Sequence, residues 1–322
     1  MKTALLYLSK CILFFTALLF SLICSAATQT QCLDKTFTLQ VLGSGGPIPE
    51  NGRASSGYLI WLDGKARFII DAGGGTFLRF GQAGARIEDL DLFALSHFHT
   101  DHSADFPAIM KGGYFSSRER PLKVTGPTGS DLFPSLNQFL QRMFDPKTGA
   151  YAYLGGYLTG TGGLFKLEPQ EVSTAMVASP DNPTVIIYQD KDVTISVLSV
   201  PHGIVPALAH RIDTPKGRVV ISTDQNGHSP SFVEFAKNAD ILVMPMAIPE
   251  ESSHPDQELH APPDVVGKIA QLTDAKLLVL SHLMGPTLRY TDDNMKIIQD
   301  LYQGPVFAAN DLECFPVQSQ KQ

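Results

Sequence analysis

Three of the chain's nine histidines stand together with one aspartate in a single short stretch, HFHTDH. His97 and His99 are two residues apart, so in an extended backbone their side chains point to the same side. Asp101 and His102 follow directly and can face a second point nearby. Neutral imidazole and carboxylate are ligands of zinc and of other first-row metals. The cluster therefore predicts a metal site, although an isolated histidine pair could equally belong to a solvated polar loop.

Three later segments show a related arrangement, in which a run of apolar residues ends in a histidine or an aspartate. These segments and the polar residues that follow them are 193–200 with His202, 217–223 with Asp224, and 276–281 with His282. If the strands lie in neighbouring sheets, these ends can converge on one rim. One ion cannot readily use all of these side chains, whereas two ions that share Asp224 as a bridging ligand can. His202 alone would be read as a turn residue, and only its place in the series favours a ligand.

The elements that must position these residues can be predicted from short apolar runs bounded by Gly, Pro and Asp. Four stretches with apolar residues at helical spacing predict helices. Residues 145–190 are irregular and rich in Gly and Tyr, and we expect an insertion or flap there rather than core. The expected strands are 37–43, 56–62, 66–75, 91–96, 122–127, 193–200, 206–213, 217–223, 239–247, 276–282 and 305–309, and the expected helices are 103–115, 130–144 (with Ser130 or Asp131 as its cap), 262–274 and 291–302. This alternation predicts a layered α/β protein.

The composition is that of a packed protein, with 43% hydrophobic and 18% charged residues among 322. The formal net charge is −7, and no run of Lys and Arg is long enough to form a basic face. Proteins that bind nucleic acids usually carry such a face. The acidic balance therefore disfavours a long polyanion as substrate, although it leaves a local basic patch open.

The first residues have the three parts of a secretory signal. Lys2 and Lys10 precede an apolar run over residues 11–24, and small residues follow it. This run is short for a membrane span, which needs about 20 residues. We therefore predict a cleaved signal peptide at 1–26 and one hydrolase domain at 27–322, with a periplasmic or secreted protein as the result. An uncleaved anchor is the alternative, and it would also export the domain.

Removal of the signal would leave two cysteines, Cys32 and Cys314, one near each end of the chain. Cysteines in an oxidising compartment often pair. We expect a disulfide between them, with two unrelated thiols as the alternative. Neither cysteine is near the histidine cluster in sequence, so we do not expect sulfur among the metal ligands.

The spacing His-x-His-x-Asp-His, followed by a later His, a later Asp and a final Ser-His, resembles the metallo-β-lactamase superfamily. The segments LGSGGPIPENGRASSGYLI, FIIDAGGG and LAHRIDTPKGRVVISTD are similar to the ribonuclease Z and arylsulfatase-like branch. The resemblance runs from about Phe37 to His282. It implies an αββα sandwich with the metal site on the rim where the two β-sheets meet.

The resemblance also implies a distribution of ligands over two zinc ions. His97, His99 and His202 would hold one ion, and Asp101, His102 and His282 the other, with Asp224 bridging. His260 is similar to the ribonuclease Z histidine that assists at the leaving group, with an ordinary residue beside a helix as the alternative. We accordingly assign Asp101 and His260 to catalysis.

Three departures disfavour tRNA processing. The position where ribonuclease Z carries a glutamate partner for this histidine is occupied by Pro245. The stretch that corresponds to the tRNA-clamping arm has few basic residues, and the chain is predicted to be exported. We therefore expect a small-molecule ester as substrate, most simply a phosphodiester or a sulfate ester.

Several alternatives remain open from the sequence. The same site could act on a carbonyl, as a lactonase or β-lactamase-like hydrolase, or the chain could be a non-catalytic metal-binding protein. The segment 151–165 could line a pocket and stack on an aryl group, with core packing as the alternative. We expect no stable membrane partner unless the signal is retained, and a homodimer stays open.

Overall fold

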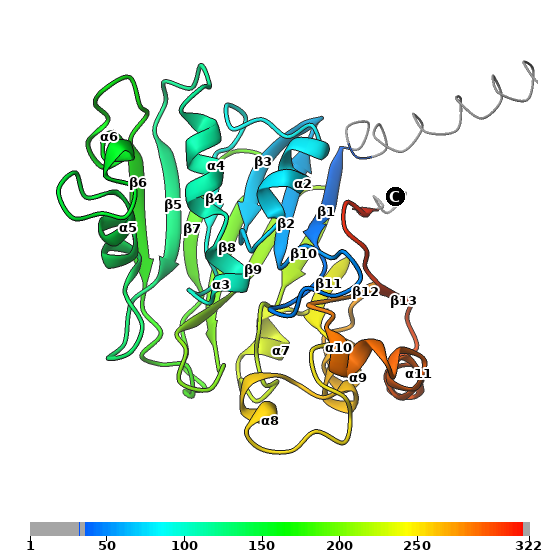
Figure 1. Cartoon of the computed structure of the whole chain (residues 1–322). Coiled ribbons are helices and arrows are strands. Elements are labelled where there is room, and N and C mark those ends of the chain that lie inside the picture. The colour runs from blue at the N-terminus through cyan, green and yellow to red at the C-terminus, as the bar shows by residue number, and fades with distance from the viewer. Residues whose placement is uncertain (1–31, 33–35, 318–322) are drawn as a thin grey trace, which may run out of the picture.

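Two seven-stranded β-sheets pack face to face, with helices on their outer faces (Figure 1). The computed structural model describes Cys32 and residues 36–317. The αββα sandwich expected from the resemblance is confirmed. The predicted signal peptide at 1–26 lies outside the described residues, and its cleavage stays a prediction. Within the described part of the chain, no helix is long and apolar enough to cross a membrane.

Sheet 1 contains the strands of the first half of the chain and one strand from its far end. Its order is β14-β1-β2-β3-β4-β5-β6. Neighbours from β14 to β3 are antiparallel, and those from β3 to β6 are parallel. The strands are β1 (Phe37–Gly43), β2 (Gly57–Leu62), β3 (Lys65–Ile70), β4 (Leu92–Ala94), β5 (Leu122–Pro127), β6 (Leu167–Val172) and β14 (Cys314–Pro316).

Sheet 2 repeats this mixed pattern with the second half of the chain. Its order is β13-β12-β11-β10-β9-β8-β7. The pairs from β10 to β13 are parallel, and those from β7 to β10 are antiparallel. The strands are β7 (Val185–Gln189), β8 (Thr194–Val200), β9 (Ala207–Thr214), β10 (Gly217–Ile221), β11 (Ile241–Pro245), β12 (Leu278–Ser281) and β13 (Val306–Ala308).

Helices lie in three places. Those outside sheet 1 are α2 (Thr76–Gln82), α4 (Phe106–Gly113), α5 (Leu136–Phe144), η1 (Ala152–Leu154) and α6 (Gly156–Thr159). Those outside sheet 2 are α7 (Phe232–Phe235), α9 (Pro263–Leu272) and α11 (Thr291–Leu301). Three short helices flank the rim where the strands deliver their polar residues: α3 (Thr100–Ser103), α8 (Asp256–Leu259) and α10 (Gly285–Leu288).

Three apolar clusters correspond to the three interfaces between these layers. Residues such as Phe37, Ile60 and Val219 fill the space between the sheets. The other two clusters join each sheet to its own helices. Burial of apolar surface in these layers is the main stabilising term of the fold, and it makes the rim a rigid support for a site.

The end of the chain returns to the sheet formed by its beginning (Figure 1). β14 pairs antiparallel with β1, with Thr38 opposite Pro316. Beside this pair, Cys32 and Cys314 form a disulfide with their Cα atoms 5.9 Å apart. The expected pairing of the two cysteines is therefore present in the structure.

Two expectations need correction. The segment 145–190 is not a flap, because Leu154, Tyr157 and Phe165 are buried in the cluster that joins sheet 1 to its helices. The helix expected over 130–144 begins only at Leu136, because Ser135 is its cap. The Ser135 side chain accepts a hydrogen bond from the Gln138 backbone, and the Gln138 side chain accepts one from the Ser135 backbone N–H. This reciprocal pair satisfies two donors at the helix start.

Candidate metal centre

All seven residues predicted as ligands meet on one rim of the sandwich. Sheet 1 delivers four of them after β4, and sheet 2 delivers the others after β8, β10 and β12. The side chains of His97, Asp101, His102, His202, Asp224 and His282 are buried, and that of His99 is half-buried. The rim is formed by the carboxyl ends of these strands, as the sequence predicted.

The backbone adopts an unusual conformation at three strand ends near the centre. Asp71, Thr223 and His282 have φ values of 61°, 53° and 56°, a left-handed conformation that few residues other than glycine adopt. Such conformations persist where the surrounding structure holds them and cluster at functional sites. Gly73 is needed here for a different reason, because any side chain at that position would collide with the Asp101 carbonyl.

Three imidazoles form the first ligand group. One nitrogen from each of His97, His99 and His202 lies within 4.8 Å of the others. His97 Nε2 is 3.1 Å from His99 Nδ1, and His202 Nε2 is 3.4 Å from the same atom. The three rings therefore point their nitrogens at one common point.

The second group combines two imidazoles with two carboxylates. Asp101, His102, Asp224 and His282 each place one ligand atom within 4.8 Å of the others. Asp224 Oδ2 lies 3.2 Å from His102 Nε2 and 3.1 Å from His282 Nε2. The same oxygen is 3.9 Å from His97 Nε2 and 3.8 Å from His202 Nε2, so it stands between the two groups.

Partners on the outer side hold several of these rings in place. Asp71 accepts hydrogen bonds from His102 Nδ1 at 2.8 Å and from the Ser96 hydroxyl at 2.7 Å. Ser96 Oγ is 3.0 Å from His97 Nδ1, and His202 Nδ1 donates to the Leu259 carbonyl at 2.7 Å. When Nδ1 is engaged in this way, Nε2 is left to face the centre. Outer partners of this kind are typical of metal-ligating histidines.

These observations fit a metal ion at each group. His102 Nε2 is buried, and the atoms that face it, Asp224 Oδ2 at 3.2 Å and Asp101 Oδ2 at 3.5 Å, are themselves potential ligand atoms that a cation would satisfy together with it. Three nitrogens in one group, and nitrogens with carboxylate oxygens in the other, are donor sets that zinc accepts. The outer hydrogen bonds pre-orient the rings for such a role.

Burial and neighbouring charges shift the pKa values of residues at the centre. Burial lowers the pKa of His97 well below its usual value, and the neighbouring His102 and His202 add to this effect. Burial opposes the ionised form of Asp224, but the surrounding His282 and His102 outweigh it and hold the pKa of Asp224 well below its usual range. The centre thus combines a neutral His97 imidazole with an ionised Asp224 carboxylate.

His260 lies beside this centre, where the sequence placed it. Its ring centroid is 5.2 Å from that of His202 and 5.1 Å from that of His282. Burial lowers the pKa of His260 to about 3, with Asp224 opposing the shift, so the ring is neutral near pH 7. His260 Nδ1 is buried without a hydrogen-bond partner among the described residues. This agrees with Pro245 standing where a charged partner was expected.

A cavity of about 440 Å³ opens onto the centre. Its floor contains five of the predicted ligands together with His260. Its walls come from Pro47, from the segment that follows β11, and from Met284 and Pro286. The Gly/Tyr-rich segment 151–165 contributes no residue to this lining, so the expected aromatic pocket wall there is wrong.

Sequence reasoning missed the residues that orient the ligands. Asp71, Ser96 and the Leu259 carbonyl act through hydrogen bonds to ligand rings. Asp71 could have been noticed, because an aspartate directly after the apolar run FII and before three glycines also ends a strand. The wall segment 248–259 carried no motif that would have marked it.

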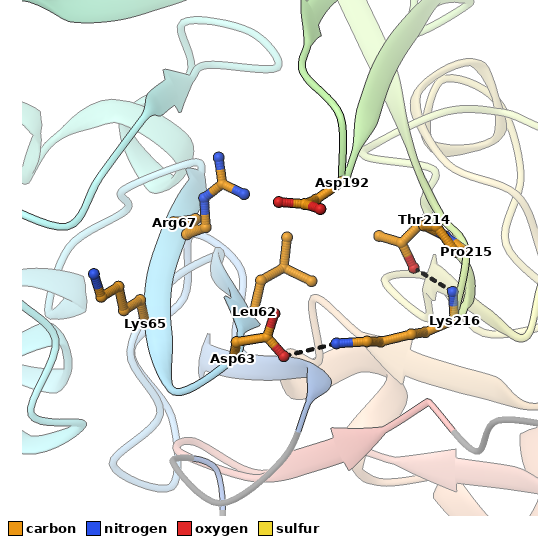
Figure 2. A pocket seen from close by; sticks show the side chains of 8 residues that line it. All are labelled: Leu62, Asp63, Lys65, Arg67, Asp192, Thr214, Pro215 and Lys216. Atoms are coloured by element: carbon orange, nitrogen blue, oxygen red, sulfur yellow. Dashed lines mark hydrogen bonds and ion pairs between the residues drawn. The ribbon is translucent and has the colours of Figure 1, made fainter.

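A second cavity, of about 340 Å³, lies beside the first residues of β3 and β10, at the ends of these strands away from the metal centre (Figure 2). It is lined by charged residues of both signs, and Lys216 Nζ pairs there with Asp63 at 2.7 Å. Arg67 is held by Asp91 and Asp190. Lys216 and Arg67 therefore already have carboxylate partners.

Comparison with known proteins gives a consistent result. The model of the beta-lactamase superfamily domain matches residues 66–283. Ribonuclease Z of Methanosarcina acetivorans is 26% identical over 281 residues, which cover 80% of this chain and 90% of that protein. A metallo-beta-lactamase fold protein from Bacillus subtilis has a TM-score of 0.66 and 22% identity, covering 88% of this chain and 99% of the other. The short form of human tRNase Z has a TM-score of 0.67 and 19% identity, covering 87% and 99%.

Proposed function

The chain belongs to the beta-lactamase superfamily, and we propose from this premise that it is an exported dinuclear-zinc hydrolase of a small ester, a phosphodiester or a sulfate ester. One observation carries the proposal. Two ligand groups lie side by side at the floor of an open cavity, and Asp224 of the second group is also 3.9 Å from His97 and 3.8 Å from His202 of the first. A paired site next to a substrate-sized space is the arrangement that two-metal hydrolases use.

Two zinc ions held by these residues would supply Lewis acidity and a nucleophile derived from water at neutral pH. The protein's own residues prepare the centre for them. Asp71 and Ser96 hold His102 and His97 on their outer nitrogens, and the Leu259 carbonyl does the same for His202. Asp101 contributes a carboxylate that is 92% buried on its side chain and 3.1 Å from His282 Nε2. Rings held in this way lose little freedom when a ligand binds.

His260 acts at the leaving group in this proposal. Its ring lines the cavity between His202 and His282. Because the ring is neutral near pH 7, it offers one N–H to an oxygen on which negative charge develops, rather than a full positive charge. Hydrogen-bond donation of this kind is worth about two orders of magnitude or more in rate when the geometry is right.

A small substrate fits better than tRNA, although the relatives named above are a ribonuclease Z and a tRNase Z. The segment that corresponds to the clamping arm packs into the core, with Leu154 and Tyr157 fully buried. The net charge of −7 also opposes a polyanion. Export is supported by the disulfide between Cys32 and Cys314, since disulfides persist mainly in oxidising compartments.

The test is a substrate panel with zinc-loaded protein that lacks residues 1–26. The panel contains a bis-aryl phosphate, an aryl sulfate, a cyclic nucleotide, a lactone and a cephalosporin. We expect turnover of a phosphodiester or of the sulfate. The variant Asp101→Ala should lose one of two metals and most of the activity. Turnover of the lactone or cephalosporin alone would assign the site to carbonyl chemistry. Absence of any turnover with two metals bound would refute the proposal that the chain is an enzyme.

A further inference from the structure

The walls of the cavity above the centre are mostly apolar, with two polar residues among them. Apart from the ligands and His260, most of its lining is apolar: Pro47, Ile248, Pro249, Leu259, Met284 and Pro286. Ser252 and Asp256 are the two polar residues of the wall. Outside this lining, the ring of Phe133 lies 5.8 Å from the ring of His99. The substrate-facing surface is therefore suited to an apolar or aryl group.

No Lys or Arg is among the residues that line this cavity in the described part of the chain. The wall segment 248–259 carries negative charges instead, and only some of its carboxylates have a partner. Glu258 pairs with His254 at 2.8 Å, and Glu250 accepts a hydrogen bond from the backbone N–H of Asp264. Asp256 is exposed and is one of the residues that line the cavity, and its carboxylate has no hydrogen bond or ion pair among the described residues.

From this wall we propose that Asp256 selects substrates by charge: the cavity takes esters whose apolar, aryl-sized group is neutral or cationic and rejects those that carry a second negative charge. This inference rests on the proposed function and names the substrate class of the same site. The carboxylates of Asp101 and Asp224 offset half of the formal charge of two divalent ions. The nucleophile derived from water and a monoanionic ester would offset the remaining two charges, and the wall has no Lys or Arg to meet a further anion.

The expected size of the effect follows from Coulomb's law. Reversing one unit charge about 7 Å from a charged substituent, in a water-like medium at low ionic strength, changes an equilibrium or a rate by about three- to sevenfold. Neutralising this charge, rather than reversing it, gives about half of the change in the logarithm of the equilibrium constant or rate. Salt screens such an interaction between exposed charges, so the effect shrinks toward one as ionic strength rises.

The test uses methyl aryl phosphate diesters that differ only in the para substituent: carboxylate, acetamide or trimethylammonium. For Asp256→Lys we expect kcat/KM relative to the acetamide ester to rise about three- to sevenfold for the carboxylate ester and to fall by the same factor for the trimethylammonium ester, because the phosphate anion common to all three cancels in this ratio. Asp256→Asn should give about half of each shift on the logarithmic scale. Dividing each variant by wild type removes the intrinsic reactivity of the three leaving groups.

Equilibrium binding provides a second readout that does not depend on turnover. Dissociation constants of monoanionic methyl arylphosphonates with the same three substituents, measured by calorimetry on metal-loaded protein, should shift in the same order. Glu168→Lys is the matched control, because Glu168 is exposed near the start of β6, at the end of the strand away from the rim. It makes the same change of net charge and should leave all three ratios unchanged.

The outcomes separate the two proposals. Ratios that follow the substituent charge in the Asp256 variants alone support charge selection. Equal ratios for all three substituents, or equal shifts in Glu168→Lys, overturn it even if the esters are hydrolysed. Phosphonate affinities that follow the charge order without hydrolysis of any ester would refute the proposed function and retain charge selection. Absence of both hydrolysis and phosphonate binding would overturn both.

Discussion

Replacing Asp71 with asparagine tests whether the outer hydrogen bonds prepare the metal centre. Asp71 is 1% exposed and accepts three hydrogen bonds, from the Ser96 backbone, the Ser96 hydroxyl and His102 Nδ1. Its φ of 61° is a conformation that asparagine tolerates as well as aspartate does, so Asp71→Asn leaves the backbone unstrained. The change therefore isolates the loss of one acceptor oxygen.

The consequence of this substitution can be followed atom by atom. An asparagine amide must place its NH2 group either against the Ser96 backbone N–H or against His102 Nδ1. In the second orientation His102 can keep a hydrogen bond only by moving its proton to Nε2, which removes the lone pair that faces Asp101 and Asp224. Loss of an outer partner typically weakens metal binding by about 10- to 100-fold, or about 1.4–2.7 kcal/mol.

The measurement is a competition titration with a chromophoric zinc chelator, combined with metal analysis of the dialysed protein. We expect Asp71→Asn to bind one of two ions about 10- to 100-fold more weakly. Asp63→Asn is the control, because Asp63 also has a positive φ, of 49°, but is exposed in the turn between β2 and β3. Two zinc affinities equal to those of wild type in Asp71→Asn would refute the reasoning.

Three further predictions concern other parts of the molecule. His260→Ala should retain both metals and lower kcat by about 100-fold, and metal loss in this variant would show that His260 is a ligand instead. Replacing Cys32 and Cys314 with serine should lower the unfolding free energy by roughly 5 kcal/mol in the chain-entropy model, measured by urea unfolding, and an unchanged midpoint would contradict it. Burial lowers the pKa of His210 to about 4, so the unfolded chain binds more protons between pH 4 and 6.5. Stability that is fully present above pH 6.5 should therefore fall by about 3 kcal/mol as the pH drops to 4. His210→Leu should lose this part of the pH dependence, and equal slopes in the two proteins would contradict the assignment.

Much of the fold could be predicted because its strands are short apolar runs with clear ends. The predicted strand 37–43 coincides with β1, and most others differ from the structure by one to three residues at an end. The ligands could be predicted for the same reason, since each follows such a run. Their convergence depended on the family resemblance, because alternation along single strands does not show which strands become neighbours.

Features that depend on contacts distant in sequence escaped prediction. Tyr157 lies in a segment whose glycines and tyrosines suggested a flap, yet its ring is fully buried and its hydroxyl donates to the Met110 carbonyl at 2.7 Å. Composition could not reveal this partner, 47 residues away. The role of Asp256 likewise depends on the position of its segment over the cavity, which nothing in its local sequence indicates.

The position of β14 has a consequence for the order in which the protein can be completed. Residues 314–316 form the edge of sheet 1, although every other strand of that sheet comes from residues 37–172. During synthesis or translocation from the N-terminus, the hydrogen-bonding edge of β1 stays uncovered until almost the whole chain has emerged. An open strand edge invites pairing with other chains. Pairing of β14 with β1 can therefore occur only late in synthesis, and we expect truncation before residue 314 to promote aggregation.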